Sequence, residues 1–69
     1  MNIGTACKLI AKEKRISAAE ISRNTGIRES YLSMLFSGKI DDPAVKRIYL
    51  IAHELGMTVD EIVTYAMEH

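Results

Sequence analysis

A mixed polar surface is predicted in the stretch NTGIRESYLSMLFSGK, residues 24–39, which contains two glycines. A helix that faces only water and core shows polar residues on one side and apolar residues on the other. Here the polar row consists of Arg28, Glu29, Ser30 and Ser33, with Tyr31 and Met34 beside it. Guanidinium donors, carboxylate acceptors and hydroxyls together can recognise the donors and acceptors of a partner.

Groups for catalysis or metal binding do not occur at useful spacings. His53 and His69 are the only imidazoles, and neither is placed to pair with Cys7 or with carboxylates. Cys7 is the only cysteine, and we expect it to be a small buried hydrophobe rather than a reactive thiol. The sequence therefore predicts neither an enzyme nor a metal or cofactor site.

The composition indicates one small domain built from helices. The chain has 69 residues, 48% of them hydrophobic, so it can build a single compact core. One Pro, four Gly and no Trp favour helices over strands. No apolar run reaches the roughly 18 residues of a membrane span, and the N-terminus lacks a signal-peptide pattern. With a single cysteine, the protein is expected to be soluble and cytoplasmic.

Charge is divided unevenly along a chain whose net charge is zero. Residues 1–40 carry seven basic and three acidic side chains, a balance of +4, whereas residues 41–69 carry two basic and six acidic ones, a balance of −4. A basic end can approach phosphate while an acidic end is held away from it. The simpler alternative is that two solvated surfaces happen to differ.

Turn and capping residues divide the first half of the chain. Apolar residues at helical spacing predict a first helix over about 3–14. The pattern SAAE at 17–20 is a capping box, so a second helix is expected from there to residue 25, closed by Gly26. The apolar pattern then restarts, and Gly38 ends it, which predicts a third helix over about 28–37.

Two more helices are predicted in the second half. Asp42 is expected at the N-cap of a fourth helix with Pro43 at its first helical position, and Gly56 is expected to end it. Its inward residues are expected to be Val45, Ile48, Ile51, Ala52 and Leu55. The pattern TVDE is a second capping box and opens a fifth helix over about 58–68. Its apolar side carries Val59, Ile62, Val63, Ala66 and Met67. The expected fold is an all-α, compact five-helix bundle.

The second and third predicted helices, joined at Gly26, form a helix-turn-helix unit whose second helix is narrow enough to enter a major groove. The segments ISAAEISRNTGIRESYLSMLFSGK, DDP and IAHELGMTVDEI together resemble the lambda-repressor-like, Xre/Cro-type DNA-binding family. The resemblance covers nearly the whole chain. Its ordered features are the turn glycine, SYLS, SGK, the proline before the fourth helix, and A-x-x-L-G at that helix's end.

The resemblance implies that the start of the third helix reads bases. The residues concerned are Arg28, Glu29, Ser30, Tyr31, Ser33 and Met34. Arg28 would pair with guanine, Glu29 would accept from a cytosine amino group, and the serines would serve several bases. Tyr31 and Met34 would make apolar contact, for instance with a thymine methyl group. Phosphate contacts are implied at Ser17, Ala18, Ser37 and Lys39, with Arg23 as a nearby cation.

Some residues depart from the family pattern. Ala18 stands where relatives often have Gln, so that phosphate contact is absent unless the backbone N–H groups behind Ser17 replace it. Asp41 and Asp42 lie close to the expected phosphate path and weaken binding unless Asp42 points inward as a cap.

A further departure concerns the core. Relatives often have a partly buried ion pair where this chain has Ala11 and Phe36. A small apolar residue facing a large one avoids the desolvation of two charges, so Phe36 is expected in the core. The alternative is an exposed aromatic ring for base stacking.

The resemblance implies a Cro-like repressor, bacterial or phage-encoded and associated with the nucleoid, that binds double-stranded DNA as a homodimer on a palindromic operator. The chain has no room for a small-molecule ligand domain. The expected dimer surface is the helix at about 58–68, through Met57, Val59, Val63, Ala66 and Met67. The alternative is that these residues complete the monomer core.

A helix-turn-helix domain that binds protein is the competing function. Zero net charge, the missing Gln and the acidic second half favour an antitoxin, anti-repressor or adaptor module with weak or no DNA binding.

Overall fold

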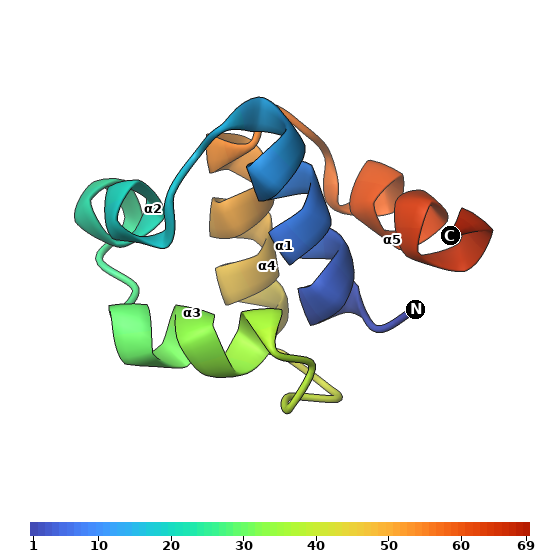
Figure 1. The fold of residues 1–69 in the computed structure, drawn as a ribbon, viewed down its shortest axis with the longest axis horizontal. Coiled ribbons are helices and arrows are strands. Elements are labelled where there is room, and N and C mark those ends of the chain that lie inside the picture. The colour runs from blue at the N-terminus through green and yellow to red at the C-terminus, as the bar shows by residue number, and fades with distance from the viewer.

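The protein folds into five helices and no strand, as described for all of residues 1–69 by a computed structural model. The helices are α1 Ile3–Lys14, α2 Ala18–Thr25, α3 Glu29–Phe36, α4 Val45–Glu54 and α5 Val59–Glu68. Figure 1 shows α2 and α3 to one side of α1 and α4, with α5 on the other side. The predicted all-α five-helix fold is confirmed. None of the five helices has the length and apolar run that a membrane crossing needs.

Backbone caps set the boundaries of the first three helices. Arg15 adopts a left-handed conformation after α1, with φ of 58°. Gly26, with φ of 80°, ends α2, and its amide donates to the Ser22 carbonyl. After α3, Gly38 has φ of 81°, and the amides of Gly38 and Lys39 donate to carbonyls in the last turn of the helix. The glycine stops predicted at Gly26 and Gly38 are confirmed.

The two predicted capping boxes differ in completeness. The Thr58 hydroxyl accepts from the Glu61 amide at 3.1 Å, and the Glu61 carboxylate accepts from the Thr58 amide at 2.8 Å, which completes the box at α5. At α2 the Ser17 hydroxyl accepts from the Glu20 amide at 3.1 Å, but the reciprocal bond from the Ser17 amide to the Glu20 carboxylate is absent. The prediction for α2 is therefore right for the helix start and wrong for the second bond of the box.

The start of α4 differs from the prediction. Ala44 is the N-cap and α4 begins at Val45, so neither Asp42 nor Pro43 has the predicted role. Pro43 is instead buried ahead of the helix, and Asp42 is exposed. Residues 44–47 are all exposed. Val45, predicted to face inward, is 78% exposed, so that prediction is wrong.

The core is a single apolar cluster to which every helix contributes. Its buried members are Ala6, Cys7, Ile10, Ala11, Ile21, Ile27, Leu32, Leu35, Ile48, Ile51, Ala52, Leu55, Ile62 and Ala66. Burial raises the pKa of the Cys7 thiol to about 11 and keeps it neutral, which confirms the expected buried hydrophobe. Phe36 is partly buried against this cluster, in agreement with its predicted core position.

Asn2, the N-cap of α1, holds the loop that follows α3. The Asn2 carboxamide oxygen accepts from the Gly4 amide at 2.7 Å and from the Thr5 amide at 3.2 Å, which caps α1. Its Nδ2 group donates to the carbonyls of Gly38 and Ile40, each at 3.3 Å. One side chain therefore joins the start of α1 to the loop after α3.

Gly4 allows the close contact between α1 and α3. A Cβ atom on Gly4 would lie 1.9 Å from the Leu35 carbonyl oxygen, a separation that no pair of such atoms tolerates. Because the obstructing atom belongs to the backbone, the clash is relieved only if one helix moves. Glycine at this position sets the distance between the two helices.

Replacement of Gly4 by alanine should destabilise the protein. In an ordinary helix interior this change stabilises by about 0.5–1 kcal/mol, because alanine loses less backbone entropy. Here overpacking against Leu35 reverses the sign, and we expect the free energy of unfolding to fall by about 1–3 kcal/mol in urea denaturation. Lys8→Ala, at an exposed position of the same helix, is the control and should change stability by less than about 0.5 kcal/mol. An unchanged or raised stability of Gly4→Ala would contradict the close approach.

Candidate nucleic-acid interface

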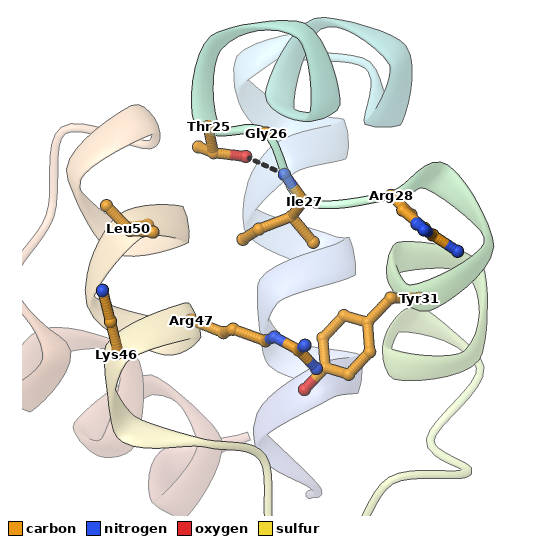
Figure 2. A pocket seen from close by; sticks show the side chains of 8 residues that line it. All are labelled: Thr25, Gly26, Ile27, Arg28, Tyr31, Lys46, Arg47 and Leu50. Carbon is orange, nitrogen blue, oxygen red and sulfur yellow. Dashed lines mark hydrogen bonds between the residues drawn. The ribbon is translucent and has the colours of Figure 1, made fainter.

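The turn between α2 and α3 is held by hydrogen bonds from one threonine. The Thr25 hydroxyl donates to the Ile21 carbonyl at 2.6 Å and accepts from the Ile27 amide at 3.2 Å (Figure 2). Gly26 lies between them with a left-handed φ of 80°. Glycine is favoured there by this backbone conformation and not by lack of space, because no atom would obstruct a Cβ. Ile27 is buried in the core. The start of α3 is thereby fixed to the end of α2.

The helix α3 has one buried and one exposed face, as a helix that reads a partner requires. Leu32 and Leu35 are fully buried and hold it on the domain. The exposed residues are Arg28, Glu29, Ser30, Ser33 and Met34. Five of the six predicted base-reading side chains are therefore accessible to a partner.

Arg28 has a different place from the one predicted. It is the N-cap of α3 rather than its first helical residue, and its side chain makes no capping bond. Its backbone is extended, with φ of −66° and ψ of 142°. Figure 2 shows its side chain directed away from the turn. The guanidinium group therefore takes no part in capping α3.

Tyr31, the sixth predicted reading residue, is partly buried and one face of its ring is occupied. The Arg47 guanidinium carbon lies 4.2 Å from the ring centroid, within the range of a cation–π contact (Figure 2). The prediction of a flanking apolar contact did not include this partner. Nothing in the local sequence of α3 signals it, since Arg47 belongs to α4.

A cavity of about 370 Å³ lies between the start of α3 and the first turns of α4. It is lined by Thr25, Gly26, Ile27, Arg28, Tyr31, Lys46, Arg47 and Leu50. Three of these residues are basic and none is acidic. The division of charge along the sequence placed Lys46 and Arg47 with the acidic half, whereas the fold places them with Arg28.

The predicted phosphate-contacting residues do not all have free polar groups. The Ser37 hydroxyl donates to the Met34 carbonyl at 2.8 Å. The Ser17 hydroxyl accepts from the Glu20 amide, and a serine hydroxyl in that arrangement still has a proton to donate. Arg23 and Lys39 are exposed, whereas Ala18 is partly buried against the core.

The predicted dimer residues on and beside α5 differ in exposure. Ala66 is only 4% exposed and belongs to the monomer core, so its prediction as an interface residue is wrong. Met57 and Val59 are partly buried against that core, and Val63 is also partly buried. Met67 is 82% exposed. A shallow groove on α5 is lined in part by the acidic residues Asp60, Glu61 and Glu68.

Comparison with known proteins identifies the same architecture. The helix-turn-helix family model matches residues 8–62, which is more than half of the chain. Among solved structures, one similar chain is SinR, the master regulator for biofilm formation, in a crystal structure of its complex with DNA. The similarity has a TM-score of 0.80 with 26% sequence identity, over 88% of this chain and 97% of the SinR chain. No curated protein sequence matches.

The Thr25 hydroxyl should contribute measurably to stability. Thr25→Val keeps the shape of the side chain but removes both hydrogen bonds and leaves the Ile27 amide without its acceptor. We expect a loss of about 1–3 kcal/mol in the free energy of unfolding, measured by urea denaturation. Thr25→Ser retains the hydroxyl and should lose less than half as much. A larger loss for Thr25→Ser than for Thr25→Val would show that the methyl group, not the hydroxyl, holds the turn.

Proposed function

This chain belongs to the Xre/lambda-repressor-like helix-turn-helix family, and on that premise we propose that it is a sequence-specific, double-stranded DNA-binding transcriptional regulator. The observation that carries the proposal is the exposed polar surface of α3, held on the domain by a helix-turn-helix. An α-helix fits the major groove, which is about 12 Å wide, and its N-terminal side chains then meet base edges. SinR, the similar chain, was solved with DNA.

The exposed side chains of α3 have the chemistry for reading bases. Arg28 at the N-cap has a planar fork that can pair with two acceptors of guanine. Glu29 can accept from a cytosine amino group, and the hydroxyls of Ser30 and Ser33 can donate or accept. Met34, 50% exposed, can contact a thymine methyl group. Glu29 also repels phosphate, so it lowers affinity for DNA in general while it favours selected bases.

Phosphate contacts would position α3 in the groove. Lys39 follows α3 and Arg23 lies in the last turn of α2, and both are exposed cations. Ser17 can donate its hydroxyl proton, and the first amides of α2, including that of Ala18, have no intrahelical acceptor. Ser37 contributes less, because its proton is already donated to Met34. The exposed Asp41 and Asp42 lie in the loop before α4 and weaken these contacts.

Two copies of the protein would read a palindromic operator. One α3 meets only a few base pairs, and a second copy about 34 Å away supplies the affinity and specificity that regulation needs. Met67 is the most exposed apolar residue on α5, which supports a contact centred there. The acidic groove on the same helix opposes close packing of two identical α5 helices, so we infer a small interface that forms together with DNA binding.

A protein-binding module is the second candidate. Its support is the exposed Glu29 in the middle of the reading surface, together with a net charge of zero. An acidic residue at that position suits a basic protein partner as well as a cytosine. The descriptions of the matching family and of SinR name no enzyme, and catalysis is not proposed.

Selection of bound sequences from a random DNA pool, followed by salt titration on the selected site, tests the proposed function. A regulator should enrich a defined sequence and lose affinity steeply as salt rises, because binding releases counterions. Arg28→Ala should cost about 1–3 kcal/mol on the selected site and relax the preference at one base pair. Lys39→Ala should weaken binding to all sequences alike and lower the salt slope by about one unit.

The alternatives give different results in the same measurements. An equal loss for Arg28→Ala on selected and random DNA would show that Arg28 touches only the backbone. A changed base preference for Lys39→Ala would contradict its assignment to phosphate. Absence of enrichment, with no dependence of retention on salt, would favour the protein-binding module.

Oligomeric state on the selected site should depend on Met67. Met67→Glu adds a fourth carboxylate to a helix whose groove already contains Asp60, Glu61 and Glu68, and it removes the apolar area of the methionine. We expect the dissociation constant of the dimer to rise about tenfold in sedimentation equilibrium, as fits the loss of one buried apolar side chain. Val45→Glu is the control, since Val45 is 78% exposed on α4. Equal effects of the two substitutions would place the interface elsewhere.

A further inference from the structure

Arg47 has an arrangement that the reading surface of α3 does not explain. Its guanidinium group lies over the ring of Tyr31, 4.2 Å from the centroid, inside the cavity between α3 and α4. Figure 2 shows Arg47 reaching from α4 to Tyr31, Lys46 running along α4 towards Leu50, and Arg28 at the start of α3 on the opposite side. Tyr31 is partly buried against the core, so its ring is a fixed platform for a long side chain that is otherwise mobile.

The cavity concentrates positive charge in a chain that has none overall. Arg28, Lys46 and Arg47 line it, no carboxylate does, and the chain as a whole has a net charge of zero. A pocket whose only charged lining residues are cations attracts an anion.

The geometry of the stacked arginine suits a phosphate group. A guanidinium that rests its face on an aromatic ring keeps its N–H edge free, and that planar edge matches two phosphate oxygens. The Lys46 ammonium can supply a further point charge from the same turn of α4. The Ile27 amide, which lines the cavity, already donates to Thr25 and is not free to bind an anion.

We propose that this cavity is a phosphate site held by Arg47 and Lys46, and that its occupant is a DNA backbone phosphate beside the groove that α3 enters. The inference rests on the proposed function, because the cavity adjoins Arg28 at the tip of the reading helix. Tyr31 is then a positioning residue for Arg47 rather than a base contact. A contact between α4 and this backbone phosphate sets the depth and angle at which α3 meets the bases.

Salt titrations on selected and random DNA test the site. Arg47→Ala should weaken binding to both DNAs by the same factor and lower the salt slope by about 0.9, the value for one phosphate contact. Lys46→Ala should act in the same direction. Lys12→Ala is the charge-matched control, since Lys12 is exposed on α1 and does not line the cavity; its slope should equal that of the unmodified protein. Thermal melting of each variant checks that the fold is retained.

Variants of Tyr31 test its positioning role. Tyr31→Phe keeps the ring face and should bind as the unmodified protein does. Tyr31→Leu removes the platform and should weaken binding about two- to fivefold, the range of a surface cation–π contact. In the double variant with Arg47→Ala, the Tyr31→Leu change should add nothing further, because its partner is already gone. A changed base preference for Tyr31→Leu, with additive losses in the double variant, would overturn this role.

The outcomes separate the phosphate site from the proposed function. Steep salt dependence in the unmodified protein that survives unchanged in Arg47→Ala and Lys46→Ala would overturn the site and leave the function intact. Absence of DNA binding by the unmodified protein would overturn both. In that case the protein is titrated with inorganic phosphate while NMR signals of the Tyr31 ring and the Arg47 side chain are recorded, to learn whether the cavity binds free phosphate. Saturable shifts that disappear in Arg47→Ala would assign the cavity to a free phosphorylated molecule instead of DNA.

Discussion

The orientation of α3 depends on the contact between the start of α1 and the end of α3. The helix α3 is short, at 8 residues, and only Leu32 and Leu35 are fully buried, so apolar burial alone gives it little to resist rotation. At one end the Gly4 backbone lies against the Leu35 carbonyl, and the Asn2 carboxamide spans α1 and the following loop. With the Thr25 turn at the other end, both ends of α3 are fixed. A reading surface must be rigid to distinguish base pairs, and these contacts supply that rigidity.

Electrostatics in this protein depends on where charges lie in space rather than on how they are distributed along the chain. Lys14 counts among the bases of the first half, yet its ammonium group donates to the Leu55 carbonyl at 2.7 Å, at the C-terminal cap of α4. Glu54 counts among the acids of the second half, yet its carboxylate accepts from the Asn24 side chain at 2.8 Å and joins α4 to α2. Lys46 and Arg47 belong to the acidic second half of the sequence, yet they line the cavity beside α3 together with Arg28. The arrangement of charge in space therefore differs from the one that a count along the sequence indicates.

The first turn of α4 links the fold to the proposed contacts. Because α4 starts at Val45, Lys46 and Arg47 lie in its first turn and line the cavity beside the start of α3, where Arg47 rests on the Tyr31 ring. Val45 in the same turn is exposed, as are Asp41 and Asp42 in the loop before the helix. In the proposed complex with DNA, the cavity would attract and the loop would repel neighbouring parts of one phosphate strand.

The sequence by itself determined the features that hydrogen bonds between near neighbours control. Ser17 and Thr58 start helices, Gly26 and Gly38 end them, and the apolar spacing identifies the buried face of α3, because each depends on residues within one or two turns. Only the tertiary structure decided the features that join distant segments: the Asn2 bonds to the loop after α3, the Arg47 contact with Tyr31, and the burial of Ala66. Periodicity locates an apolar face but not the partner that covers it. A short-range pattern likewise carries no record of which side chain lies opposite once the helices have packed.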